Sequence, residues 1–262
     1  MGQAINNKYT VVLTRASEEL SSTAQPFIER GFNILNFPVI QIVPKVLSAE
    51  IRSALEELNN SSFNWIIFTS RNGVKVLSEL QLLAGLKIDI PSATNICTVG
   101  PETSGQLRSI YKREVSLISQ NEQAAGIAES FQSLQANRLK IFIPTPEKSS
   151  FDLPLALKAL GHTIRAEVIY TTVRTEPDAS AIIELSQLDA SRCIFTFFSP
   201  SAFYALKDTV NQNSLLEKAR LASIGPSTSS AIRSAGLEVF AESSDRSAAA
   251  LAQAISDRLL HD

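Results

Sequence analysis

Apolar residues in this chain come in short runs of strand length, and each run is followed by a segment with helical spacing. The first run, 9–13, precedes a segment from about 17 to 30 with apolar residues every three or four positions, and Gly31 stands where that helix should end. The run 65–68 is apolar without alternation, which is typical of a strand buried on both faces of a parallel sheet. The pattern predicts alternating strands and helices.

The remaining elements follow from the same reasoning. The stretch 32–43 is mostly β-branched or aromatic and is bounded by Pro38 and Pro44. Two stretches each contain a strand, a tight turn and the first turn of a helix, and they are 96–107 and 221–232. Further strands are predicted at 114–118, 139–143, 194–198 and 237–241. Further helices are predicted at 49–58, 74–83, 123–134 and 248–259. Another is predicted after the strand 139–143 and runs to Leu160.

The order of elements restarts half-way along the chain. Arg15 precedes Gly31 by 16 residues, and Thr145 precedes Gly161 by the same 16. The strand end at Ser70 recurs at Ser199, 129 residues later, and the Gly-Pro turn recurs after 125 residues. These spacings indicate that one unit of about half the chain has been duplicated.

Both copies place Gly-Pro-x-Thr-Ser where an apolar run gives way to helical spacing, at Gly100 and at Gly225. Glycine allows a sharp turn, proline suits the first helical position, and Thr103 or Thr228 can cap the free amides. The start of a helix presents N–H donors and the positive end of the helix dipole. Each turn is therefore suited to an anionic ligand.

Strands that alternate with helices predict an α/β protein, with two flavodoxin-like or Rossmann-like parallel sheets produced by the duplication. Ligands of such sheets bind beyond the carboxyl ends of the strands. The segments singled out here follow strand ends, and they are 14–15, 70–73, 100–104, 199–202 and 225–229. Two domains that present these loops to each other are expected to form a cleft.

Composition excludes several classes of protein. With 24 Lys and Arg against 26 Asp and Glu and no long run of like charge, a nucleic-acid surface is not expected. Cys97 and Cys193 lie in apolar runs, which favours buried thiols in a reducing compartment, and two histidines give little scope for a metal site. Residues 1–7 lack the apolar core of a signal peptide, and no apolar run is long enough to span a bilayer. We therefore expect a cytoplasmic protein without a membrane partner.

Familiar catalytic motifs are missing from the sequence. Gly100 to Gly105 has the glycine spacing of a P-loop, but Gln106 and Leu107 stand where that motif needs lysine and a hydroxyl residue. No GxGxxG follows a strand, and the chain contains no HExxH, CxxC or GxSxG. The motifs indicate anion binding rather than a reactive side chain.

Taken in order, the strand-end motifs resemble those of the uroporphyrinogen-III synthase family over almost the full length. They are Leu13-Thr14-Arg15 with Gly31, Phe68-Thr69-Ser70-Arg71-Asn72-Gly73-Val74, Val99-Gly100-Pro101-Glu102-Thr103, Val168-Ile169-Tyr170, Phe198-Ser199-Pro200-Ser201-Ala202 and Ile224-Gly225-Pro226-Ser227-Thr228. The resemblance implies two α/β domains joined by two linker strands. The first domain would combine 1–37 with 176–262, the linkers would be 38–47 and 166–175, and the second domain would be 48–165. The repeat alone suggests tandem halves near 1–136 and 137–262, and periodicity does not decide between these divisions.

The resemblance also implies an activity. Members of this family are cofactor-free hydro-lyases that convert hydroxymethylbilane, a linear tetrapyrrole with eight carboxylates, into uroporphyrinogen III. Water leaves, an azafulvene forms, and ring D is inverted through a spiro intermediate. The protein holds a flexible polyanion in one conformation, which is mainly an orientation effect. The implied partners are this substrate and, transiently, hydroxymethylbilane synthase, and the implied state is a monomer.

Site residues are carried over on the matching positions. Tyr170 is the candidate proton donor to the leaving hydroxyl. The candidate substrate-binding residues are Arg15, Ser70, Arg71, Asn72, Gly100, Thr103, Ser104, Ser199, Ser201, Gly225 and Thr228. The chain departs from the family pattern in having Ser104 and Ser229 where a small apolar residue is usual, and Thr145 where an arginine is expected.

Each candidate also has a plain structural interpretation. Ser70, Thr103, Ser199 and Thr228 can be helix N-caps and nothing more. Arg15 and Arg71 can be solvated surface residues, and a tyrosine among β-branched residues is ordinary in a strand.

Two other functions remain open from the residues alone. A non-enzymatic two-domain receptor for a small anion would have the same strand-end loops. A nucleotide-sugar transferase would have two Rossmann-like domains, but the chain is short for one, and no acidic metal-binding pair stands at a strand end.

Overall fold

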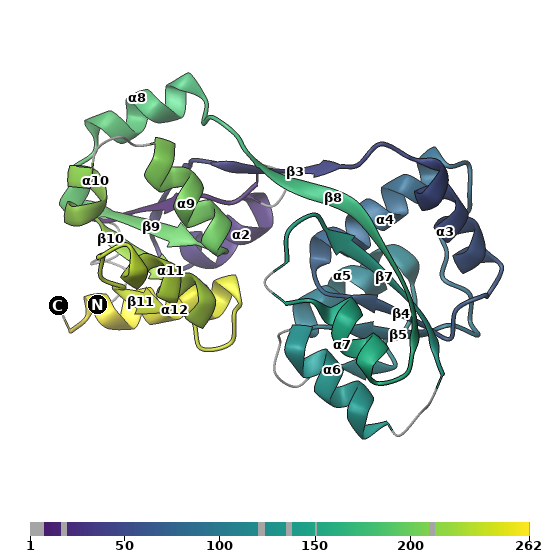
Figure 1. Ribbon diagram of the computed structural model, residues 1–262. Helices are drawn as coiled ribbons and strands as arrows, with labels where there is room; N and C mark the ends of the chain where they lie inside the picture. Colours follow the sequence, from purple (N-terminus) through teal and green to yellow (C-terminus); the bar gives the residue numbers. More distant parts are fainter. Residues whose placement is uncertain are drawn as a thin grey trace. The chain divides into compact units, whose positions relative to one another are not determined.

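The structure is a computed structural model that describes residues 8–16, 20–119, 124–134, 138–149, 151–209 and 213–261. The N-terminal segment 1–7 and the start of the helix expected from about 17 lie outside these residues. The chain forms two compact units, one made of 1–41 with 173–262 and the other of 42–172 (Figure 1).

The first unit is built on a five-stranded sheet in the order β11-β10-β9-β1-β2. Its strands are β1 (Thr10–Leu13), β2 (Asn33–Asn36), β9 (Cys193–Phe197), β10 (Arg220–Ser223) and β11 (Ala241–Glu242). All neighbours in this sheet are parallel, and β1 from the start of the chain pairs with β9 from its second half. The sheet therefore joins segments that are far apart in the sequence.

The second unit contains a six-stranded sheet in the order β3-β8-β7-β4-β5-β6. Its strands are β3 (Ile40–Pro44), β4 (Trp65–Phe68), β5 (Asn95–Thr98), β6 (Leu117–Ile118), β7 (Lys140–Pro146) and β8 (Thr163–Arg174). The strands from β8 to β6 are parallel to their neighbours. The short strand β3 and the long strand β8 pass from one unit into the other, since the unit boundaries fall inside them.

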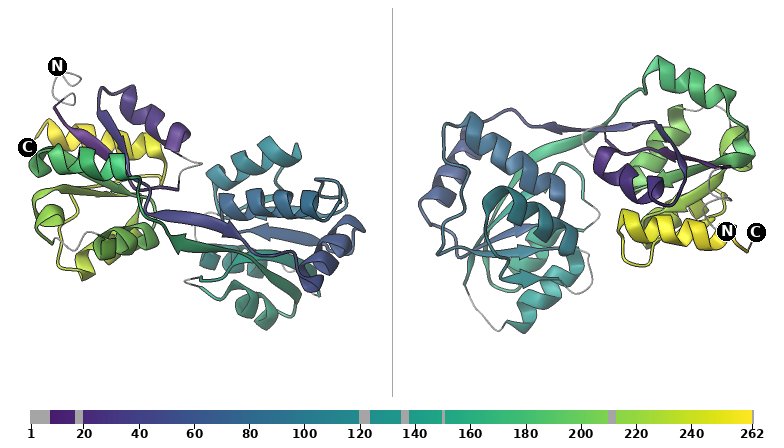
Figure 2. Two further views of the ribbon diagram at one scale, coloured as in Figure 1. Left: turned by 90° about the horizontal axis from the view of Figure 1, so that it is seen from above. Right: turned by 180° about the vertical axis from the view of Figure 1, so that it is seen from behind.

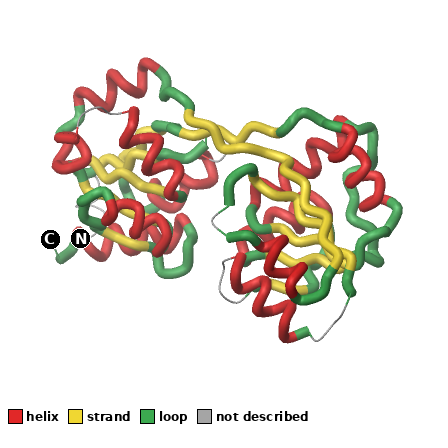
Figure 3. Tube along the Cα trace, viewed as in Figure 1, coloured by secondary structure: helices red, strands yellow, loops and turns green. Residues whose placement is uncertain are grey.

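Helices cover both faces of each sheet (Figures 2 and 3). The first unit has α2 (Leu20–Ile28), α8 (Ala179–Gln187), a 3-10 turn (Ala190–Arg192), α9 (Pro200–Thr209), α10 (Asn213–Lys218), α11 (Pro226–Ser234) and α12 (Ala248–Leu259). The second unit has α3 (Ala49–Asn59), α4 (Arg71–Leu83), α5 (Pro101–Tyr111), α6 (Ala124–Ser133) and α7 (Leu153–Ala159).

The apolar runs supply a core on each side of a sheet because successive strand residues face opposite ways. In β4, Ile66 and Phe68 pack in the core beneath α3, α4 and α5, whereas Ile67 packs with α6 and α7. In β1, Val12 faces the core that includes α8, α9 and α11, whereas Val11 and Leu13 face α2 and α12. The α/β fold with parallel sheets expected from the sequence is confirmed.

Several expected boundaries were wrong. The helix expected from Val74 begins at Arg71 instead, because Ser70, the residue before Arg71, is its N-cap. The stretch 32–43 is two strands, β2 and β3, since Pro38 has no N–H to continue a ladder. Helices α8 and α10 lie in a part of the chain for which the hydrophobic pattern had predicted no element.

The strand expected at 139–143 continues to Pro146, so Thr145 lies in a strand rather than in a strand-end loop. Beyond Phe142 this strand pairs only with β8 among the described residues, and the two prolines remove N–H groups from the opposite side. The Thr145 hydroxyl donates to the carbonyl of Glu167 at 3.1 Å.

The last strand of each repeat is shorter than expected. The strand expected at 114–118 is confined to Leu117–Ile118, and the one expected at 237–241 is Ala241–Glu242. Leu237 instead closes α11, because its N–H donates to the carbonyl of Ile232 and Gly236 has a φ of 78°.

Candidate functional site

The candidate residues follow neighbouring strands of each sheet. In the second unit Phe68 pairs with Thr98, so the turns at Ser70 and Gly100 lie next to each other. In the first unit Phe197 pairs with Ser223, so the turns at Ser199 and Gly225 are neighbours in the same way. The duplication thus produces one double turn at the carboxyl edge of each sheet.

Ser70 and Tyr170 meet in the second unit. Ser70 is the N-cap of α4, and its Oγ accepts the N–H of Gly73 at 3.0 Å. The same Oγ lies 2.8 Å from the Oη of Tyr170, which β8 carries. Ser70 is therefore an N-cap, as its plain structural interpretation proposed, and it also binds the candidate proton donor.

The contact between Ser70 and Tyr170 uses only one of their two hydroxyl hydrogens. Either oxygen can donate across the 2.8 Å contact, and the Ser70 Oγ already accepts an amide N–H. One hydroxyl hydrogen is used between the two residues, and the second has no acceptor among the described residues. Tyr170 is only 4% exposed, and this burial raises the pKa of its phenol, although the Ser70 hydrogen bond acts in the opposite direction. At neutral pH the pair is thus a neutral hydrogen-bond donor.

The two Gly-Pro turns have the same geometry. Gly100 and Gly225 are the N-caps of α5 and α11, with φ values of −177° and 162° and no side-chain cap. Because this backbone is extended, the turn does not need the left-handed region for which glycine is favoured. Thr103 and Thr228 stand at the third helical position and do not cap their helices, which corrects the expectation that they would.

Ser104 and Ser229 each bind a hydroxyl residue on the preceding strand. The Ser104 Oγ lies 2.6 Å from the Oγ1 of Thr98, and the Ser229 Oγ lies 2.6 Å from the Oγ of Ser223. All four side chains are fully buried. These pairs explain why both repeats have a serine where the family usually has a small apolar residue.

One of the turn threonines is buried without a hydrogen-bond partner. Thr228 is 1% exposed, and its Oγ1 makes no hydrogen bond with any of the described residues. A buried hydroxyl left unpaired costs about 1–3 kcal/mol, so such an atom calls for an explanation. Thr103, the equivalent residue, is 4% exposed.

The two candidate arginines have partners inside their own units. The Arg71 Nε lies 3.5 Å from the Glu102 carboxylate, so the first turns of α4 and α5 are joined by an ion pair. The Arg15 guanidinium lies 4.8 Å from the centre of the Phe198 ring. Arg15 therefore stands beside the Ser199 turn.

The remaining candidates are more exposed. The Ser199 Oγ accepts the N–H of Ala202 at 3.2 Å, Ser201 is exposed in the first turn of α9, and Asn72 is half-buried. The second unit thus brings together Ser70, Arg71, Asn72, Gly100, Thr103, Ser104 and Tyr170. The first unit brings together Arg15, Ser199, Ser201, Gly225 and Thr228.

Sequence reasoning missed Arg246, which lies against Gly225. A Cβ placed on Gly225 would be 3.4 Å from both Cγ and Nε of Arg246. Arg246 stands in an ordinary polar loop between β11 and α12, and nothing in the local sequence marks it.

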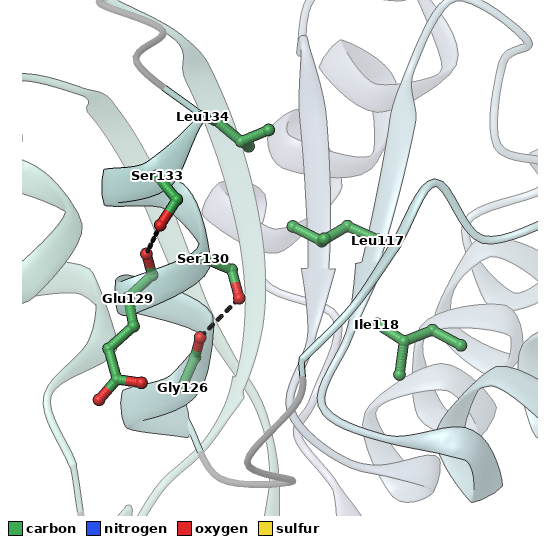
Figure 4. Close-up of a pocket in the computed structure, with 7 residues that line it drawn as sticks. All are labelled: Leu117, Ile118, Gly126, Glu129, Ser130, Ser133 and Leu134. Atoms are coloured by element: carbon green, nitrogen blue, oxygen red, sulfur yellow. Dashed lines mark hydrogen bonds between the residues drawn. The ribbon is translucent and has the colours of Figure 1, made fainter.

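A cavity of about 420 Å³ lies away from these turns, between β6 and α6 (Figure 4). Its lining residues are Leu117, Ile118, Gly126, Glu129, Ser130, Ser133 and Leu134. The Ser130 and Ser133 hydroxyls donate to carbonyls of their own helix at 2.8 and 3.1 Å. This cavity contains none of the candidate residues, and we assign it no role.

Within the described ranges, no three His, Cys, Asp or Glu side chains are grouped so that they could hold a metal ion. In the same part of the chain, no helix has both the length and the apolar character that crossing a bilayer requires.

The family model described as "Uroporphyrinogen-III synthase HemD" matches residues 21–253. The chain belongs to this family. The expectation drawn from the ordered strand-end motifs is therefore confirmed. Among curated proteins, the chain is 23% identical over 192 residues to a putative uroporphyrinogen-III synthase of Methanocaldococcus jannaschii, covering 72% of this chain and 73% of that protein.

The chain is also 28% identical over 109 residues to the porphyrin biosynthesis protein HemD of Ruminiclostridium josui, covering 42% of this chain. That match spans only 20% of the R. josui protein.

Solved structures of the family share the fold. A mutant uroporphyrinogen III synthase from Thermus thermophilus matches with a TM-score of 0.60 at 17% identity, over 97% of this chain and 100% of that one. The uroporphyrinogen-III synthetase of Helicobacter pylori matches with a TM-score of 0.61 at 17% identity, over 94% of this chain and 97% of that one. At this identity the two likenesses establish the fold.

Proposed function

We propose that this protein converts hydroxymethylbilane into uroporphyrinogen III with loss of water. Family membership supports this activity, and the observation that carries it is the Ser70–Tyr170 hydroxyl pair at the carboxyl edge of a parallel sheet. The pair is neutral, combines a buried Tyr170 with a half-buried Ser70 at a helix start, and holds one hydrogen that can be donated.

The first chemical step needs such a donor. Breaking the C–O bond of the hydroxymethyl group releases water only if that oxygen gains a proton, while the pyrrole nitrogen supplies electrons to form the azafulvene. Ring D then attacks through its substituted carbon to give the spiro intermediate, which fragments and recloses in the inverted orientation. The final closure releases a proton from the α-carbon of ring D, so protons balance and only water is lost. No atom is oxidised or reduced, and the chemistry requires no redox cofactor.

Tyr170 is proposed as the donor, and Ser70 as the residue that positions it. The short contact fixes the phenol while the N-cap bond to Gly73 fixes the serine. A donor held in place contributes more to the rate than a mobile one, because less orientation entropy is lost at the transition state.

The substrate carboxylates are proposed to bind at the helix starts. First-turn amides of α5 and α11 and the side chains of Asn72, Ser201 and Thr228 would donate to them. The same turns would be shaped by Ser199, Gly100 and Gly225. Positive charge beside them would come from Arg15 and Arg71. The Ser104 hydroxyl is buried against Thr98, so its contribution is to the turn itself.

A coupled assay tests the proposal. Hydroxymethylbilane synthase supplies the substrate, and the porphyrins obtained by oxidation are separated by chromatography. Adding this protein should shift the product from the type I isomer, which forms without a synthase, to type III. Type I alone from a folded sample would overturn the proposal.

A further inference from the structure

The start of α11 is covered by an arginine from another part of the first unit. Arg246 precedes α12, and its Nε would lie 3.4 Å from a Cβ built on the N-cap residue Gly225. The guanidinium therefore lies at the end of the helix where backbone N–H groups lack carbonyl partners and the dipole is positive.

A second observation at this helix start points to a ligand. Only 1% of Thr228 is exposed, and its Oγ1 has no hydrogen-bond partner in the part of the chain that the structure describes. Helical side chains lean toward the N-terminus, and residues three apart share a face, so the Thr228 side chain leans toward Gly225 and the end that Arg246 covers. A ligand oxygen bound there would satisfy it.

The equivalent turn of the second unit differs in charge. Glu102 is the second residue of α5, where α11 has Ser227, and Glu102 pairs with Arg71 at 3.5 Å. The start of α5 thus already has a carboxylate of the protein, whereas the first turn of α11 contains no acidic residue. The two repeats have thus diverged in charge at the second residue of this helix.

Two carboxylates stand near Arg246 in the chain, and each accepts a hydrogen bond from the protein. Glu242 accepts the hydroxyl of Ser229, and Asp245 accepts the N–H of Ser247 at 3.0 Å. Ser229 is the fourth residue of α11, so the Glu242 carboxylate lies beside the first turn of that helix and is bonded to a hydroxyl there.

We propose that Arg246 and the first turn of α11 bind one carboxylate of the tetrapyrrole. The inference rests on the proposed function for the identity of the ligand. A guanidinium offers two parallel N–H donors to a carboxylate, and Thr228 with the Ser227 amide offers further donors to the same group.

The test compares Arg246→Gln and Arg246→Lys with a matched control, Arg233→Gln, in which an exposed arginine in the last turn of the same helix is replaced. Steady-state rates with hydroxymethylbilane give kcat and KM. Anaerobic titration with uroporphyrinogen III gives a dissociation constant that does not depend on turnover.

Arg246→Gln should raise KM and the product dissociation constant about 10-fold or more, the scale of one charge-assisted hydrogen bond, with kcat within about two-fold of the parent. Arg246→Lys should recover part of the affinity, and Arg233→Gln should match the parent. Equal affinities for Arg246→Gln and Arg233→Gln, in a parent protein that forms the type III isomer, would overturn this inference alone. A parent protein that neither binds the product nor forms type III would overturn the proposed function as well.

Discussion

The Oγ of Ser70 lies 2.8 Å from the Oη of Tyr170, although the two residues are 100 positions apart in the chain. Ser70 follows β4 and caps α4, whereas Tyr170 belongs to β8, with β7 between the two strands in the sheet. The parallel sheet thus brings two hydroxyls from separate strands into one hydrogen-bonded pair.

Replacing Tyr170 by Phe removes the proposed proton donor while the ring stays in the core. We expect turnover to fall about 100-fold, within the range that positioned acids contribute, with little change in thermal stability. The coupled isomer assay measures the rate. The matched control is Tyr111→Phe, since Tyr111 is also buried and donates to Gln81 at 2.9 Å. This control should cost about 1 kcal/mol of stability and leave turnover unchanged. Full activity of Tyr170→Phe would show that its hydroxyl has no catalytic role.

Thr228→Val should change stability and activity in opposite directions. Valine has nearly the same shape and removes a buried hydroxyl that has no partner, so the free energy of unfolding should rise by up to about 1–2 kcal/mol. If that hydroxyl binds substrate, KM should rise several-fold. Thr98→Val is the matched control because Thr98 is equally buried but bonded to Ser104, and it should destabilise the protein. Chemical denaturation and steady-state kinetics measure the two effects. A destabilised Thr228→Val protein would contradict this account of the hydroxyl.

His162 should make the second unit sensitive to acid. It is 6% exposed, neither ring nitrogen has a hydrogen-bond partner among the residues described, and its ring packs edge-on against Phe131. Burial lowers the pKa of this imidazole below its ordinary value of 6.5. The unfolded chain therefore binds a proton more readily than the folded one below that pH.

Proton linkage determines how the free energy of unfolding changes with pH. The contribution of a neutral, buried His162 is fully present above pH 6.5. It decreases as pH falls toward the lowered pKa, by at most about 1.4 kcal/mol per pH unit. His162→Phe should flatten this part of the stability profile, whereas His261→Gln, at an exposed position, should leave it unchanged. Urea unfolding between pH 5 and 8 measures the slopes, and identical profiles for parent and His162→Phe would refute the prediction.

Both cysteines should resist alkylation in the folded protein. Burial raises the pKa of the Cys97 thiol to about 12, and burial together with Asp189 raises that of Cys193 to about 11. Since only the thiolate reacts, iodoacetamide at pH 8 should label neither residue until denaturant is added. Mass spectrometry counts the adducts, and rapid labelling of native protein would show that these thiols are accessible.

Much of the fold could be predicted from local patterns. The run 65–68 supplies residues to two cores, as continuous apolar character requires of a strand covered on both faces. The repeated Gly-Pro turns fold alike, and even the unusual Ser104 and Ser229 make the same hydrogen bonds. These features depend on neighbouring residues, and neighbouring residues are what a sequence records directly.

The sequence predicted element boundaries wrongly where contacts with another element set the extent of a strand. Thr145 lies in a strand because β8 continues to pair with β7, and the strand expected from 237 starts later because Leu237 closes α11. The pattern also did not reveal Arg246, since a polar loop looks the same whether or not it lies over a helix start.

By itself the sequence determined the alternation of strands and helices, the duplication, the helix starts suited to anions and the family resemblance, because periodicity and turn chemistry are local. Only the tertiary structure decided that β1 pairs with β9, that Ser70 binds Tyr170, that Thr228 is left unpaired and that Arg246 covers Gly225. Each of these relationships joins separate elements, and their meeting is set by strand order and by packing across the sheet.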